Sequence, residues 1–194
     1  MNLRILHKSP DFNIPKPELE QYATPSEIVE EIIKQAYSLG HLSGKVADLG
    51  SGTGRLAIGA AIFGADITAY EIDEDPLEIA QDYAKKNNLK IKWKNKSIES
   101  INEKYETVIM NPPFGSQRPG ADIIFLKKAL EISENIWTIH LSSTREFIEK
   151  FVKNNKGEII TAYEFMFPIE RTMEFHSKDV KEEKAILYHI ASLE

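Results

Sequence analysis

Short apolar runs alternate along the chain with longer amphipathic segments. A short apolar run predicts a buried strand, and apolar residues spaced by three and four predict a helix with one buried face. Strands are predicted at residues 45–49, 66–72, 90–95, 107–110, 137–141, 157–167 and 185–191. Helices are predicted at residues 25–39, 55–63, 76–87, 121–135 and 143–154. This alternation is typical of an α/β protein, a mostly parallel seven-stranded sheet with helices on both faces.

No helix is predicted between the last two strands. The polar segment "PIERTMEFHSKDVKEEK" joins them, so we expect a C-terminal antiparallel hairpin added to the parallel sheet. Residues 1–20 show no clear period and are predicted to form an irregular N-terminal arm. The sequence therefore predicts a single domain over residues 1–194, of which residues 1–20 are the arm.

The composition is that of a globular protein, with 42% hydrophobic residues in 194. Cysteine is absent, which excludes disulfides and thiolate metal sites, and the five histidines lack metal-ligand spacing. We therefore expect no metal site. No segment approaches the roughly 20 apolar residues of a membrane span, and the N-terminus lacks a signal-peptide pattern. We expect no membrane association and a cytoplasmic location.

The net charge of −6 gives the whole molecule no long-range attraction for nucleic acid. However, "KKNNLKIKWKNK" at residues 85–96 holds six lysines and no acid. Lys90, Lys92, Lys94 and Lys96 alternate with other residues, which places them on one face of a strand. Two interpretations stay open and are compatible: an edge strand protected from aggregation, or a stripe that contacts phosphates.

A glycine-rich turn lies in "VADLGSGTGRLAIGAA", between a predicted strand and a predicted helix. Gly50, Gly52 and Gly54 would let the backbone approach a ligand, and the amides at the helix start favour polar groups. Asp48 ends the preceding strand. The loop alone has little specificity, because many tight strand-to-helix turns need glycine.

Glu71 makes the glycine loop more informative. It stands at the end of the next strand, about 20 residues further on, where an acid can accept both hydroxyls of a ribose. Loop and acid together indicate an adenine nucleoside cofactor. A dinucleotide would favour G-x-G-x-x-G, whereas this loop reads G-S-G-T-G and follows Asp48, which suits a cationic group. S-adenosylmethionine fits because it carries an ammonium, a sulfonium and a ribose, and no phosphate.

"DLGSGTG" resembles the first motif of class I methyltransferases, and Glu71 resembles their ribose-binding acid. By that resemblance the loop would cradle the methionine part of S-adenosylmethionine. Members of the class commonly present an Asp to the adenine amino group, and here "KWKNKSIES" offers Ser97 instead. A hydroxyl can also accept that hydrogen bond. Ile72 and Ile98 are expected to line the adenine slot.

The decapeptide "NPPFGSQRPG" follows the predicted strand at residues 107–110. In open α/β sheets ligands bind at the carboxyl ends of strands, so Asn111 should face the reactive methyl group. "NPPF" resembles the Asp/Asn-Pro-Pro-aromatic motif of methyltransferases that act on planar nitrogens. The Asn111 side-chain oxygen and the Pro112 carbonyl would accept the amine hydrogens, and Phe114, after Pro113, would stack on the extruded base. The alternative is a Pro-rich turn that merely ends a strand.

A narrower resemblance covers the chain from about Glu20 to the last strand. "EQYATPSEIVEEI", "DLGSGTGRLAIGAA", "EIDEDPLEIA", "TVIMNPPFGSQRPGADIIFLKKAL", "HLSSTREFI" and "EFHSKD" are similar to the methyltransferase-like 5 family of small-subunit rRNA adenine N6-methyltransferases. The family implies a Rossmann-like fold with strand order 3-2-1-4-5-7-6 and a small zinc-binding activator subunit. By matching position, Gln21 and Thr24 would close over the cofactor, and Thr53 would line its loop.

The resemblance implies an S-adenosylmethionine-dependent enzyme that makes N6-methyladenosine in small-subunit rRNA. Other planar nitrogens remain as alternatives: guanine N2 in RNA, adenine in DNA, or a protein glutamine. A non-catalytic RNA-binding scaffold is a further alternative from another functional class.

Overall fold

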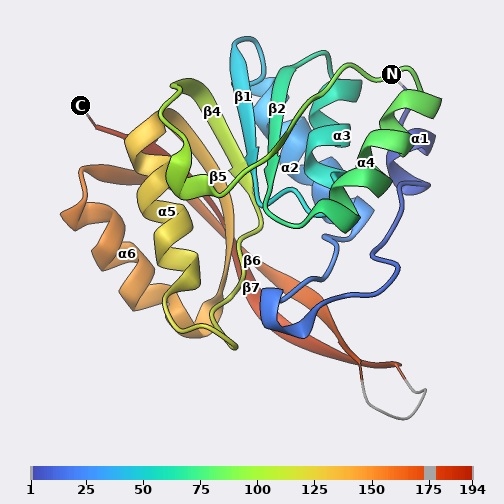
Figure 1. The fold of residues 1–194 in the computed structure, drawn as a ribbon. Coiled ribbons are helices and arrows are strands. Elements are labelled where there is room, and N and C mark those ends of the chain that lie inside the picture. The colour runs from blue at the N-terminus through green and yellow to red at the C-terminus, as the bar shows by residue number, and fades with distance from the viewer. Residues whose placement is uncertain (1, 173–177, 194) are drawn as a thin grey trace.

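The computed structural model describes residues 2–172 and 178–193. Seven strands form one sheet with helices on both faces (Figure 1). The strands are β1 Lys45–Leu49, β2 Asp66–Glu71, β3 Lys92–Asn95, β4 Tyr105–Met110, β5 Ser133–Leu141, β6 Gly157–Thr172 and β7 Lys178–Ser192. The α-helices are α1 Arg4–His7, α2 Ser26–Ser38, α3 Arg55–Ile62, α4 Glu74–Lys86, α5 Ala121–Ile132 and α6 Arg145–Asn154. Short 3₁₀ turns are η1 Pro17–Leu19, η2 Ile98–Ser100 and η3 Ser142–Thr144.

The strand order is β3-β2-β1-β4-β5-β7-β6, which confirms the predicted order. Strands β1 to β5 pair in parallel, whereas β7 pairs antiparallel with both β5 and β6. The predicted C-terminal hairpin is therefore confirmed. The lysine-rich segment supplies β3 at the edge of the sheet, which confirms the edge-strand interpretation, and Lys92 Nζ lies 2.7 Å from an oxygen of Asp66.

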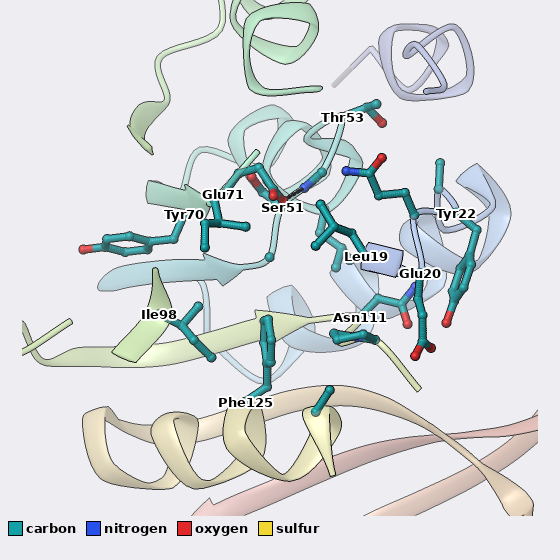
Figure 2. A pocket seen from close by; sticks show the side chains of 18 of the residues that line it. Leu19, Glu20, Tyr22, Ser51, Thr53, Tyr70, Glu71, Ile98, Asn111 and Phe125 are labelled. Atoms are coloured by element: carbon teal, nitrogen blue, oxygen red, sulfur yellow. Dashed lines mark hydrogen bonds between the residues drawn. The ribbon is translucent and has the colours of Figure 1, made fainter. Parts of the chain in front are cut away.

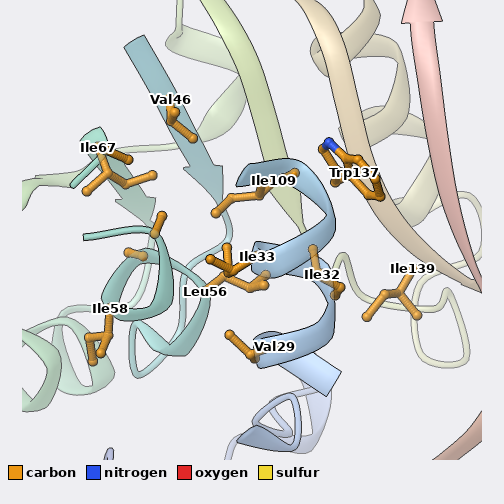
Figure 3. Close-up of a cluster of buried hydrophobic side chains, with 14 of the residues drawn as sticks. Val29, Ile32, Ile33, Val46, Leu56, Ile58, Ile67, Ile109, Trp137 and Ile139 are labelled. Carbon is orange, nitrogen blue, oxygen red and sulfur yellow. The ribbon is translucent and has the colours of Figure 1, made fainter. Parts of the chain in front are cut away.

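Two apolar layers hold the helices on the sheet. On one face, Val29, Ile32 and Ile33 of α2 and Leu56 of α3 pack in the same cluster as the strand residues Val46, Ile67 and Ile109 (Figure 3). On the other face, the buried residues of α5 and α6 pack on β1, β4 and β7. Because both faces are covered, the central strands β1, β2 and β4 consist mostly of buried residues. Asp48 and Glu71 stand at or near the carboxyl ends of β1 and β2.

Some predicted boundaries were wrong. The helix predicted at 121–135 ends at Ile132, because Ser133 and Asn135 pair with Tyr105 and Thr107 in the parallel ladder of β4 and β5. Strands β6 and β7 extend beyond residues 157–167 and 185–191, since the outer part of the hairpin pairs through its backbone without an apolar pattern. Residues 174–177 of the quoted "EFHSKD" lie outside the described part of the chain.

The N-terminal arm is more ordered than predicted. It contains α1 and η1, and Leu6 is 1% exposed in the apolar layer formed with α2 and α3. The Tyr83 hydroxyl donates to the Ile5 carbonyl at 2.6 Å. A four-residue helix is too short to show a period, so the pattern could not reveal it.

The described residues contain no helix that is long and apolar enough to cross a lipid bilayer.

The packing of the arm predicts that Leu6→Ala lowers the free energy of unfolding by about 2–4 kcal/mol, since it leaves a cavity in the apolar layer. Ile14→Ala is the matched control, because Ile14 is 84% exposed in the same arm, and it should change stability by less than about 0.5 kcal/mol. Urea denaturation measures both values. Equal, small effects would show that the arm does not pack on the helices.

Candidate active site

A pocket of about 260 Å³ lies at the carboxyl ends of the central strands. Its wall comes from the arm, the loops after β1 and β4, the residues around the ends of β2 and β3, and the first turn of α5 (Figure 2). Eleven residues predicted from sequence for the cofactor and acceptor sites line it: Gln21, Thr24, Gly50, Gly52, Thr53, Glu71, Ile72, Ser97, Ile98, Asn111 and Pro113. Asp48, Gly54, Pro112 and Phe114 do not line this pocket.

The glycine loop has no room for side chains. Gly50 and Gly52 both have positive φ, at 70° and 52°. A Cβ at Gly50 would lie 2.8 Å from the Phe125 ring, and one at Gly52 would lie 2.7 Å from the Phe12 ring. A side chain at either position would therefore collide with one of these rings, so the loop keeps a bare backbone beside the pocket.

Glu71 lies directly against this loop. Its Oε2 accepts the Gly52 N–H at 2.7 Å, and its Oε1 accepts the Asp73 N–H at 2.9 Å. Burial raises the pKa of the Glu71 carboxyl, while the backbone hydrogen bonds oppose that shift. Each carboxylate oxygen has a further lone pair, so Glu71 can still accept hydrogen bonds from a ligand's hydroxyls.

Asp48 is buried and does not line the pocket. Its Oδ2 accepts the Ala57 N–H at 2.9 Å in the first turn of α3, and its Oδ1 has no partner among the described groups. Burial raises the pKa of the Asp48 carboxyl to about 8, and the nearby Glu71 carboxyl adds to this shift. The Asp48 carboxyl lies at the start of α3, where the partial positive charge of the helix dipole favours an acidic side chain.

Ser97 and Ile98 line the pocket after β3, together with Ile72, which is 62% exposed. The Ser97 Oγ accepts the Glu99 N–H at 3.3 Å and so caps the η2 turn. Phe125 and Tyr70 also line the pocket, and sequence reasoning missed both. Their apolar surroundings in sequence indicated only core positions.

The arm and Gln21, the residue after it, close the pocket on the side of Glu71. Gln21 Nε2 donates to Asp73 Oδ2 at 2.6 Å. Lys16 Nζ donates to Asp73 at 2.7 Å and to Asp75 at 2.8 Å, and these hydrogen bonds raise the Lys16 pKa. Gln21 lines the pocket, and its closure over the cofactor stays a prediction. Phe12 and Lys16 were not expected to contribute to this side.

The arm also holds the loop after β4. The Gln117 N–H donates to Glu20 Oε1 at 2.8 Å, although these residues lie far apart in sequence. Glu20 has a left-handed backbone with φ of 51°, which is uncommon for a residue other than glycine. The strained turn aims its carboxylate at the loop that carries the NPPF segment.

The Asn111 side chain is fixed at one end only. Its Nδ2 donates to the Thr24 Oγ1 at 3.0 Å, whereas its buried Oδ1 has no partner among the described groups. Figure 2 shows Asn111 across the pocket from Glu71. Thr24 lies directly before Pro25, which holds the N-cap position of α2.

Phe114 is buried, so in this conformation its ring is not free to stack on an extruded base as expected. It is 8% exposed and packs against Tyr22 and Phe167, with ring centroids 5.3 Å and 5.6 Å away. Pro112 is also buried, while Pro113 faces the pocket. The sequence could not show this because the rings that cover Phe114 come from Tyr22, just after the arm, and from Phe167 of β6.

The geometry combines a bare glycine loop and a buried acid on one side with an amide oxygen on the other. The family model that matches residues 22–134 is described as "Methyltransferase small domain". An uncharacterized protein of Methanocaldococcus jannaschii is 37% identical over 192 residues, which cover 92% of this chain and 87% of that protein.

The rRNA N(6)-adenosine-methyltransferase METTL5 of Danio rerio is 33% identical over 177 residues, which cover 86% of each chain. The crystal structure of a candidate RNA methyltransferase from Pyrococcus horikoshii superposes with a TM-score of 0.92 at 35% identity, covering 99% of this chain and 96% of the other. The chain therefore belongs to the METTL5 family within the class I S-adenosylmethionine-dependent methyltransferases.

Proposed function

We propose that this protein transfers a methyl group from S-adenosylmethionine to the N6 atom of an adenosine in small-subunit rRNA. METTL5 relatives over most of the chain support the reaction. The observation that carries the proposal is the buried, unpartnered Asn111 Oδ1 on the pocket wall opposite Glu71. A free amide oxygen at this position can accept a hydrogen bond from an amine.

The residues present fit S-adenosylmethionine. Gly50 and Gly52 leave the loop backbone bare where it lines the pocket, which suits a ligand that approaches the backbone closely. Glu71 would accept the ribose hydroxyls, Ser97 and Ile98 would contact the adenine, and Thr53 and the glycine loop would hold the methionine part. When bound, this cofactor supplies an electrophilic methyl group on a sulfonium.

Asn111 would act on the methyl acceptor. The lone pair of an adenine N6 is delocalised into the ring and becomes nucleophilic when its hydrogens are held out of the ring plane. The Asn111 Oδ1 and the Pro112 carbonyl would accept these two hydrogens and orient the nitrogen. No strong base is required, because the nitrogen becomes cationic on methylation and then releases its proton readily.

Phe114 would stack on the target base only after the loop rearranges, since the ring packs on Tyr22 and Phe167 in the present conformation. Gly115 and Gly120 follow Phe114 in the same loop and both have positive φ, so they can absorb a change of backbone direction. Binding of the acceptor would then release the ring from its packing.

An RNA substrate would meet positive charge near the pocket, because Lys96 and Arg118 line its wall. Lys90, Lys92 and Lys94 extend this charge along and beside β3. The small zinc-binding activator and the cytoplasmic location that we expect from the sequence stay predictions. Guanine N2, DNA adenine and protein glutamine are less favoured as acceptors, since the METTL5 relatives that match most of this chain act on rRNA adenosine.

Asn111→Ala should slow methyl transfer to small-subunit rRNA by about 100-fold or more, because it removes an acceptor that orients the nucleophile. Cofactor affinity should change by less than about threefold, since the amide serves the acceptor. Transfer of a labelled methyl group and calorimetry with S-adenosylhomocysteine measure the two effects. Asn155→Ala, an exposed Asn at the end of α6, is the control. Equal loss of binding and transfer would indicate a structural role for Asn111.

The raised pKa of the Asp48 carboxyl predicts that the stability of the ligand-free protein depends on pH. This pKa is raised to about 8 in the fold, against about 4 in an unfolded chain. The stabilising contribution of the protonated carboxyl is complete below about pH 4 and is lost as the pH rises through 8. The free energy of unfolding should therefore fall more between pH 5.5 and pH 8 in the wild type than in Asp48→Asn. The difference between the two falls should be on the order of 1 kcal/mol or more. Urea denaturation that gives parallel pH profiles for both proteins would contradict this.

A further inference from the structure

The Asn111 amide has two chemically different ends, and only one of them can serve an amine acceptor. An oxygen turned toward the pocket accepts an N–H, whereas an NH₂ group turned the same way would meet the amine with donors. In the structure the Nδ2 end is bonded to the Thr24 hydroxyl, and the Oδ1 end is left free. The orientation of this amide therefore depends on what holds its nitrogen.

Thr24 is itself held in place. It is 6% exposed, and its carbonyl accepts from Arg55 Nη1 at 3.1 Å. Arg55 is the first residue of α3, directly after the glycine loop, and its guanidinium also reaches the Ser9 carbonyl at 3.4 Å. Thr24 is β-branched, which restricts its side-chain rotamers, and it precedes the rigid Pro25. The hydroxyl is thus presented at a fixed point.

We propose that Thr24 is a positioning residue that orients the Asn111 amide with its oxygen toward the methyl acceptor. The inference deepens the proposed function and rests on it. It assigns to Thr24 a role on the acceptor side of the reaction, distinct from the cofactor-closing role that its place in the "EQYAT" segment suggests. A residue that fixes the orientation of a side chain in contact with the substrate increases the reaction rate, because the site is already arranged before the substrate binds.

Because the two ends of the Asn111 amide differ, the role of Thr24 can be tested in the wild type and in the Asn111→Asp variant. Thr24→Val keeps the shape and removes the hydroxyl, and Thr24→Ser keeps the hydroxyl. In wild-type Asn111, we expect Thr24→Val to lower kcat by about tenfold, roughly the rate equivalent of one hydrogen bond, with cofactor affinity within about threefold. Thr24→Ser should restore most of the rate. In the Asn111→Asp background both ends are oxygens, so Thr24→Val should cost less than about threefold.

Two kinetic results would overturn the inference. A Thr24→Val loss of equal size in both backgrounds would show that Thr24 supports the fold of the pocket rather than the direction of the amide. An unchanged kcat in Thr24→Val would show that the amide orients without it. If the valine variant does not fold, Thr24→Ala takes its place in the same comparison.

A spectroscopic readout separates this inference from the proposed function. The Asn111 side-chain amide signals are assigned by their absence from the ¹H–¹⁵N spectrum of Asn111→Asp. We expect a downfield-shifted Nδ2 proton in the wild type and in Thr24→Ser, and loss of that shift in Thr24→Val. An unshifted wild-type signal, or one unchanged in Thr24→Val, would overturn the inference. A wild type with the shifted proton but no methyl transfer to rRNA would refute the proposed function alone.

Discussion

The parallel pairing of β1 with β2 and β4 is the constraint on which the site depends. Asp48 of β1 stands in register with Ala69 and Ile109, so the three strands reach their carboxyl ends at the same edge of the sheet. The glycine loop, Glu71 and Asn111 come directly after this register and are therefore brought together. The apolar layers on both faces fix that register, because a slip by one residue would turn buried side chains outward.

The arm turns this strand edge into an enclosed pocket. The arm and the residue after it contact the Glu71 side of the pocket through Lys16 and Gln21, which bond to Asp73. They contact the Asn111 side through Glu20, which accepts from Gln117. The same segment thus joins the two loops that would bind the two substrates. Since Asp73 also donates its N–H to Glu71, the arm, the acid and the glycine loop form one connected network.

The sequence predicted those parts of the structure that are encoded by the residue pattern of one short segment. The glycine loop, Glu71 and the NPPF segment each combine a strand end with residue types that chemistry requires, and the structure places Gly50, Gly52, Glu71 and Asn111 around one pocket. The burial of Phe114, the closure by Phe12 and the Glu20 contact depend on segments far apart in the chain, which no local pattern contains. The start of β5 at Ser133 was missed because Ser133, Glu134 and Asn135 are polar and show no apolar strand pattern, although Ser133 and Asn135 pair with β4.

The central claim is that this pocket presents an rRNA adenosine to an activated methyl group. Mass spectrometry of nucleosides from purified small-subunit rRNA tests it most directly, in cells that lack the gene and in cells that regain it. The account predicts that N6-methyladenosine is lost from this rRNA on deletion and returns when the wild-type protein is restored. An unchanged N6-methyladenosine content after deletion would contradict it.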